Sequence, residues 1–64
     1  MDDPALEEII EQVEDLRTQL RHLRALRKIS VECDFGEITQ QLDADIIETR
    51  IMLATIGRLV PEAL

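Results

Sequence analysis

The chain has 64 residues, a formal net charge of −7 and a pI near 4.4. This acidity argues against non-specific attraction to nucleic acid or to an anionic membrane. The longest uninterrupted apolar run, residues 51–54, is far shorter than the roughly 20 residues of a membrane-spanning helix. The acidic N-terminus lacks the basic start of a signal peptide, so we expect a cytoplasmic protein without membrane contact.

The first half of the chain is predicted to form one long helix over residues 4–29. Asp2 and Asp3 precede Pro4, and an aspartate at the N-cap followed by proline at the first helical position favours a helix start. Apolar residues then follow at spacings of 3, 4, 3, 4 and 3, which places them on one side of a helix. These residues are Leu6, Ile9, Val13, Leu16, Leu20 and Leu23.

A turn is predicted over residues 30–34, where poor helix formers interrupt the pattern. Asp34 is followed three positions later by Glu37, which resembles the capping box that starts a helix. We therefore expect the second helix over residues 35–60, and we expect Phe35 to close the end of the hairpin core.

The second helix is predicted to be apolar on two sides. One side is expected to face the first helix and carries Leu42, Ile46, Leu53 and Ile56, together with Ile38, Val60 and Thr49. The Thr49 hydroxyl should bond back to its own helix. The other side carries Ala44, Ile47, Ile51 and Ala54, with Met52 and Leu59 on the flank between the two. One neighbouring helix cannot cover both sides.

An antiparallel hairpin that turns near residue 33 should pair residues whose numbers add up to about 65. This rule gives every apolar layer of the first helix a partner in the second. The predicted layers are Ile9 with Ile56, Val13 with Leu53, Leu16 with Thr49, Leu20 with Ile46, and Leu23 with Leu42.

Charges alternate in blocks along the chain, and the blocks predict cross-helix ion pairs. Residues 1–16 hold seven acids and no base, residues 17–28 hold five bases and no acid, and residues 32–48 hold six acids and no base. The bases Arg24, Arg27 and Lys28 are expected in the last turn of the first helix, where they oppose the macrodipole. We expect Arg17, Arg21, Arg24 and Lys28 to lie beside Glu48, Asp45, Asp43 and Glu37.

The same basic run is the candidate for nucleic-acid contact, because phosphate binding needs clustered Arg and Lys. Its members are Arg17, Arg21, Arg24, Arg27 and Lys28. The favoured interpretation is an ion-paired helix side, since acidic residues are expected opposite and stacking aromatics for single-stranded RNA are missing.

No metal, cofactor or catalytic site is predicted. His22 and Cys33 are the only soft metal ligands, whereas a structural zinc site needs four. A zinc site shared across a dimer, with Glu32 or Asp34 added, is the alternative. The Glu-x-x-His motif of di-metal bundles is absent from the sequence. Because the inward positions are almost entirely Leu, Ile and Val, we do not expect an enzyme.

These patterns predict an all-α fold in which residues 1–64 form a single domain. The domain is an antiparallel, coiled-coil-like hairpin of two helices that assembles into a homodimeric four-helix bundle. We expect a non-enzymatic oligomerisation and protein–protein interaction module, such as a small regulator or adaptor. A tetramer, a docked helix of another protein and an oligomerisation segment of a larger protein are the alternatives. The predicted oligomer interface consists of Ala44, Ile47, Ile51, Ala54, Met52 and Leu59.

In size and arrangement the predicted hairpin resembles the Rop type of small plasmid regulator, a helical hairpin that dimerises and binds paired RNA loops. The resemblance is architectural and involves no shared motif, so it transfers no RNA-contacting residue. It implies RNA regulation through the arginines of the first helix as a second hypothesis for the function.

Overall fold

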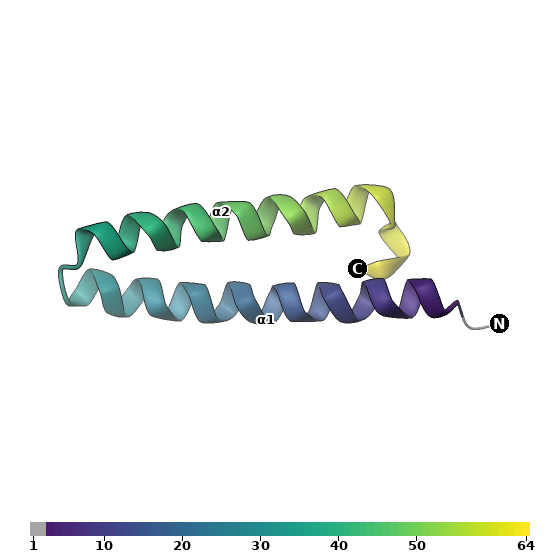
Figure 1. Cartoon of the computed structure of the whole chain (residues 1–64), viewed down its shortest axis with the longest axis horizontal. Helices are drawn as coiled ribbons and strands as arrows, with labels where there is room; N and C mark the ends of the chain where they lie inside the picture. The colour runs from purple at the N-terminus through teal and green to yellow at the C-terminus, as the bar shows by residue number, and fades with distance from the viewer. Residues whose placement is uncertain (1–2) are drawn as a thin grey trace.

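The computed structural model describes residues 3–64 as two long antiparallel helices and a short C-terminal turn (Figure 1). Helix α1 spans Pro4–Glu32, helix α2 spans Gly36–Leu59, and the 3-10 turn η1 spans Pro61–Ala63. The hairpin is elongated, measuring 51 × 16 × 11 Å along its principal axes. The predictions of an all-α fold and of two helices that pack against each other are confirmed.

Helix α1 begins as its sequence predicts. Asp3 is the N-cap, and its carboxylate accepts hydrogen bonds from the backbone N–H groups of Ala5 at 3.0 Å and Leu6 at 3.4 Å. Pro4 occupies the first helical position, where its missing N–H costs no hydrogen bond. The capping role falls to Asp3, and Asp2 lies outside the described residues.

Helix α1 continues three residues beyond its expected end and closes at Glu32. The backbone N–H of Phe35 donates to the Ser30 carbonyl at 3.0 Å, and that of Asp34 donates to the Val31 carbonyl at 3.1 Å. Asp34 itself has a φ of 60°. These features make a Schellman motif with aspartate at the left-handed position that glycine usually fills.

The extension of α1 overturns one expectation about charge. No basic residue lies in the last turn of α1, so the prediction that Arg24, Arg27 and Lys28 would oppose the macrodipole there is wrong. The helix simply continues past them before it ends.

The start of α2 also differs from the prediction. Its N-cap is Phe35, which makes no side-chain capping bond. The expected capping box between Asp34 and Glu37 is absent because Asp34 is held in the turn that ends α1. The Phe35 side chain is 53% exposed and does not close the core.

At the turn end of the hairpin, where Phe35 was expected to close the core, the structure has two hydrogen-bonded hydroxyl groups. Ser30 is buried, and its Oγ lies 3.0 Å from the Phe35 carbonyl oxygen and 2.6 Å from Thr39 Oγ1. Thr39 Oγ1 lies 2.9 Å from the same carbonyl. Each hydroxyl has one proton to donate, so one of them donates to the carbonyl and the other donates within the hydroxyl pair.

The core between the helices is thin. Val13 and Leu42 are buried, and the other eight predicted core residues are half-buried. Thr49 is also buried, and its hydroxyl donates to the Asp45 carbonyl at 2.8 Å, which confirms the predicted bond back to its own helix. The large apolar residues of α1 and α2 therefore cover each other only in part.

The register between the helices differs from the predicted one by about one helical turn. The hydroxyl pair Ser30–Thr39 and the ion pair Arg27–Asp43 join residues whose numbers add up to 69 and 70, rather than 65. The shift arises because α1 ends three residues later than expected, which moves the centre of the turn from residue 32 to residue 34. A total of 69 places Leu16 level with Leu53, instead of Thr49. Apolar layers still meet, since the stripes repeat every three or four residues.

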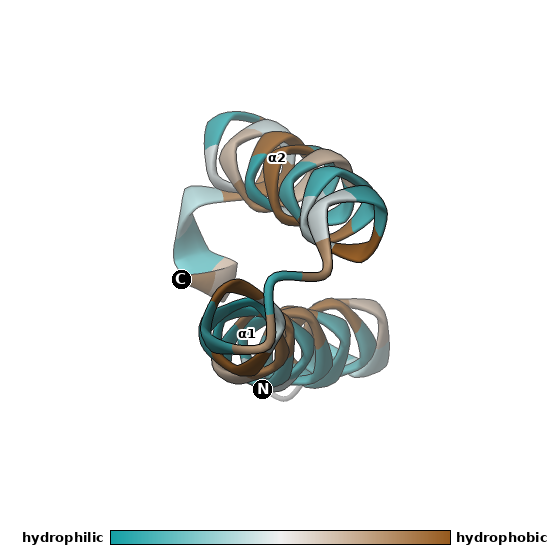
Figure 2. Cartoon of the chain, turned by 90° about the vertical axis from the view of Figure 1, so that its left-hand side faces the viewer, coloured by the Kyte–Doolittle hydropathy of each residue, from teal (hydrophilic) through white to brown (hydrophobic). Residues whose placement is uncertain are grey.

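The C-terminal turn closes the open end of the hairpin. Figure 2 shows η1 crossing from α2 toward α1 on one side of the molecule, and Ala63 is buried there. A Cβ atom at Gly57 would overlap the Leu64 side chain, so the glycine lets the turn approach α2 closely. No helix within residues 3–64 combines the length and the apolar character needed to cross a membrane.

Candidate functional site

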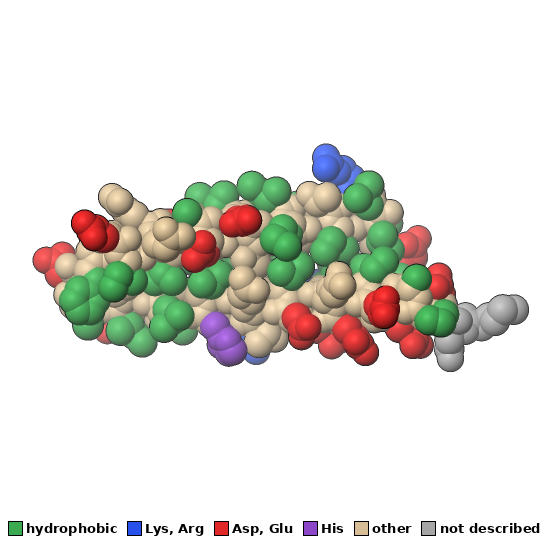
Figure 3. Space-filling view, in the orientation of Figure 1, with side chains coloured by type: hydrophobic (Ala, Val, Ile, Leu, Met, Phe, Trp, Pro, Cys, Tyr) green, Lys and Arg blue, Asp and Glu red, His purple; other side chains and the backbone are tan. Residues whose placement is uncertain are grey.

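The candidate site is an apolar stripe on the side of α2 that faces away from α1. We call Ala44, Ile47, Ile51 and Ala54 the outer stripe. Ile47 is 58% exposed and Ile51 is 60% exposed. At 3.6 residues per turn, the outer stripe points about 160° away from the α2 core residues, nearly opposite to them. Figure 3 shows hydrophobic side chains along the outer edge of α2.

A basic side chain borders this apolar surface. Ile47, Arg50, Ile51 and Ala54 line a shallow groove on α2. Arg50 and Glu48 lie on opposite flanks of the outer stripe, because each is about 80° from its centre on the helical wheel. The groove can thus take the apolar side of another helix with polar or acidic neighbours. Nothing in the sequence pattern alone had singled out Arg50 as part of this surface.

Two residues of the predicted interface, Met52 and Leu59, belong to the flank of α2 between the outer stripe and the core side. Met52 is 46% exposed and lines a hollow with Gln12, Asp15, Leu16 and Gln19 of α1. Leu59 is 73% exposed and lies two turns further along the same side of α2 as Met52. These side chains extend the apolar surface over the groove between the helices.

A second apolar surface surrounds the turn end of the hairpin. Five large hydrophobic residues there are each 52–55% exposed. They are Leu26, Ile29, Val31, Phe35 and Ile38. Ile38 was expected on the side of the hairpin core, but its place in the first turn of α2 leaves it beside the end of α1.

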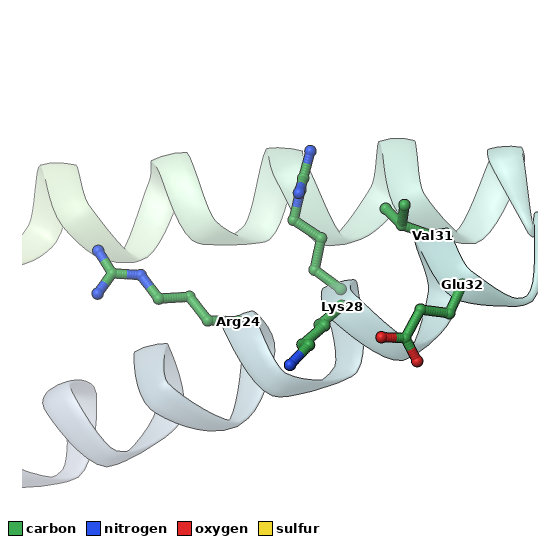
Figure 4. Close-up of a pocket in the computed structure, with 5 residues that line it drawn as sticks. Arg24, Lys28, Val31 and Glu32 are labelled. Carbon is green, nitrogen blue, oxygen red and sulfur yellow. The ribbon is translucent and has the colours of Figure 1, made fainter.

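Basic side chains form a stripe along α1, on a broad side of the hairpin. We call Arg17, Arg21, Arg24 and Lys28 the basic stripe. All four are exposed, and they line two neighbouring hollows on α1 together with Leu20, Arg27, Val31 and Glu32. Figure 4 shows the Arg24 and Lys28 side chains extending from α1 at one of these hollows.

The predicted ion pairs of this basic stripe do not form. Within residues 3–64 the structure contains one salt bridge, between Arg27 and Asp43, whose side chains are 45% and 46% exposed. Asp43 thus pairs with Arg27 and not with Arg24. The expected pairing of Arg17, Arg21 and Lys28 with Glu48, Asp45 and Glu37 is wrong. On the helical wheel, Asp45 and Glu48 lie on the same side of α2 as Met52 and its hollow, whereas the basic stripe lies on the other broad side of the hairpin.

Metal-ligating side chains are scattered over the part of the chain that the structure describes. No group of three or more His, Cys, Asp and Glu residues there could hold a metal ion. His22 and Cys33 are both exposed, and their positions differ by 11 residues, which corresponds to about 16 Å along a helix. The chemistry that this surface offers is therefore apolar and ionic contact.

Comparison with known proteins finds no matching family model, no similar curated protein and no similar solved structure.

Proposed function

We propose that the protein is a non-enzymatic self-association module, which acts as a small regulator or adaptor. In this proposal the hairpin forms a homodimer of four helices through the outer stripe of α2. The observation that carries the proposal is the exposure of Ile47 and Ile51, at 58% and 60%, on the side of α2 that α1 does not cover.

The solvent-accessible area of the hairpin is larger than that expected for a compact monomer, which supports the proposal of a partner. The chain exposes 5137 Å², whereas a compact monomer of 7.3 kDa is expected to expose roughly 4,200 Å². The excess of roughly 900 Å² is close to the ~800 Å² that each partner contributes to a standard protein–protein interface. Part of this excess reflects the elongated shape of the hairpin.

The two isoleucines can supply a useful share of the binding free energy. Complete burial of an isoleucine side chain contributes about 1.5–3 kcal/mol. Since Ile47 and Ile51 are each about three-fifths exposed, covering the remainder contributes about 1–2 kcal/mol per residue. The four isoleucines of a dimer would give about 4–7 kcal/mol, against the ~8 kcal/mol of a micromolar dissociation constant.

The oligomeric state in solution tests this proposal. We expect sedimentation equilibrium over a hundredfold range of concentration to show a dimer. The double variant Ile47→Asp with Ile51→Asp should be monomeric, because it places four carboxylates in the contact. The control carries Leu26→Asp and Ile29→Asp, which alters two residues of similar exposure on α1, and it should stay dimeric. A wild-type monomer at every concentration, or a dimer of the Ile47/Ile51 variant, would overturn the proposal.

RNA binding through the basic stripe is a second candidate function. The observation that favours it is that none of the four basic side chains has an ion-pair partner in the described chain. Contact with four phosphates predicts an affinity that falls with salt at a log–log slope of roughly −3 to −4. Replacing Arg21 and Arg24 by Gln should reduce that slope, whereas Arg58→Gln on α2 should not. Absence of any gel retardation of structured RNA at low salt would reject this function.

A further inference from the structure

We infer that the partner on the outer stripe is a second copy of this chain whose α2 lies antiparallel, with the two-fold axis on the outer side of α2 at the level of position 49. The inference rests on the proposed self-association and adds the direction and the shape of the assembly. Four helices then lie side by side in one layer, in the order α1, α2, α2 and α1.

The layer follows from the position of the outer stripe. A square four-helix bundle needs contact surfaces on α2 that are about 90° apart, because each helix touches two neighbours at right angles. The outer stripe lies about 160° from the α2 residues that contact α1. A copy that covers Ile47 and Ile51 must therefore extend the hairpin sideways, beyond α2, and cannot stack on its broad side.

The spacing of the outer stripe fits a two-fold contact. Ala44, Ile47, Ile51 and Ala54 follow each other at intervals of 3, 4 and 3, and the same residue types recur in reverse order. A two-fold axis at position 49 places Ile47 of one copy against Ile51 of the other, and Ala44 against Ala54. This arrangement is self-complementary, as a symmetric dimer requires, and the small alanines allow close approach at both ends.

Charges in line with the outer stripe give the direction. Glu37 and Gln40 continue it toward the start of α2, and Arg58 continues it toward the end. An antiparallel pair brings Arg58 of each copy to Gln40 and Glu37 of the other. A parallel pair would instead place Arg58 beside Arg58 and Glu37 beside Glu37, which like-charge repulsion disfavours.

The helix dipoles agree with this direction. The antiparallel pair sets the positive end of each α2 macrodipole beside the negative end of the other.

The antiparallel layer has a consequence for the basic stripe. Its two-fold axis is perpendicular to the layer, so the basic stripes of both copies lie on the same broad side. With helix axes 8–10 Å apart, the two stripes are separated by about 30 Å. A parallel pair would place them on opposite sides.

Cys33 provides a direct probe, because it is the single cysteine and it is exposed at the turn. When Cys33 carries a nitroxide label, double electron–electron resonance on the dimer should give a distance of about 45–50 Å between the two labels for the antiparallel layer. A parallel pair would bring the two Cys33 residues to about 25–30 Å. The short distance would overturn the inferred direction and leave the proposed self-association intact.

Disulfide trapping tests the contact itself. In a Cys33→Ser background, Ala44→Cys and Ala54→Cys chains should form a disulfide when mixed, but neither should do so alone. In the antiparallel layer two residues at position 44 are about 15 Å apart along the axis, beyond the ~7 Å that a disulfide spans. A disulfide between two Ala44→Cys chains indicates a parallel pair. A dimer that forms no disulfide, either in the mixture or in one variant alone, uses another surface. Either result overturns the inference, whereas a monomeric wild type rejects self-association altogether.

Discussion

Replacing Asp34 by glycine should stabilise the hairpin, because Asp34 holds a φ of 60° just after the C-cap of α1. A residue with a side chain loses about 1–2 kcal/mol in this left-handed conformation. Glycine avoids that cost, although its greater freedom in the unfolded chain returns about 0.5–1 kcal/mol. We expect a net gain of about 0.5 kcal/mol, which corresponds to a rise in Tm of about 2–4 °C for a domain of this size.

A series at the same position separates backbone conformation from charge. Asp34→Asn removes the charge and keeps a short polar side chain that tolerates the left-handed region, so it should match the wild type within about 0.5 kcal/mol. Asp34→Val carries a β-branched side chain there and should lose about 1 kcal/mol. Urea unfolding, followed by helicity at one fixed protein concentration, measures the series. A valine variant as stable as the wild type, or a glycine variant less stable than it, would refute the Schellman geometry.

Two further substitutions test the core and the helix start. Val13→Ala removes the side chain that is 1% exposed and should cost about 2 kcal/mol from lost burial and the resulting cavity. The matched control Val31→Ala, at a residue that is 53% exposed, should change stability by less than about 0.5 kcal/mol; equal losses would contradict the packing. Asp3→Ala should cost about 1 kcal/mol through the lost N-cap, whereas Asp3→Asn should cost little. An alanine variant with full stability would show that the cap contributes nothing.

The parts of the fold that depend on local patterns could be predicted from the sequence. The 3–4 spacing of apolar residues and the Asp3–Pro4 pair indicated two long helices and the start of α1, and the structure bears these out. The bond from the Thr49 hydroxyl to the Asp45 carbonyl was predictable for the same reason. Each of these features involves residues at most a few turns apart.

The end of α1 could not be predicted from helix propensity. Ser30 and Val31 are poor helix formers, but their helix propensities are lower than that of alanine by only a few tenths of a kcal/mol per residue. Burial of Ser30, with its hydroxyl beside Phe35 and Thr39, outweighs it and keeps the segment helical. This three-residue extension moved the turn and displaced every cross-helix pair by about one turn. Every predicted apolar layer was displaced with it, although apolar residues of the two helices still face each other.

The candidate site poses a different problem, because the outer stripe has the same sequence pattern whichever helix covers it. The structure adds the direction in which the outer stripe points and the exposed fractions of its side chains. The hydrophobic residues that the hairpin buries are Val13, Leu42 and Ala63, a small core against the conformational entropy that about 60 ordered residues lose. In the proposed dimer, a second copy on the outer stripe adds apolar burial to α2. Folding and association would then be coupled, so the proposal predicts that stability rises with protein concentration.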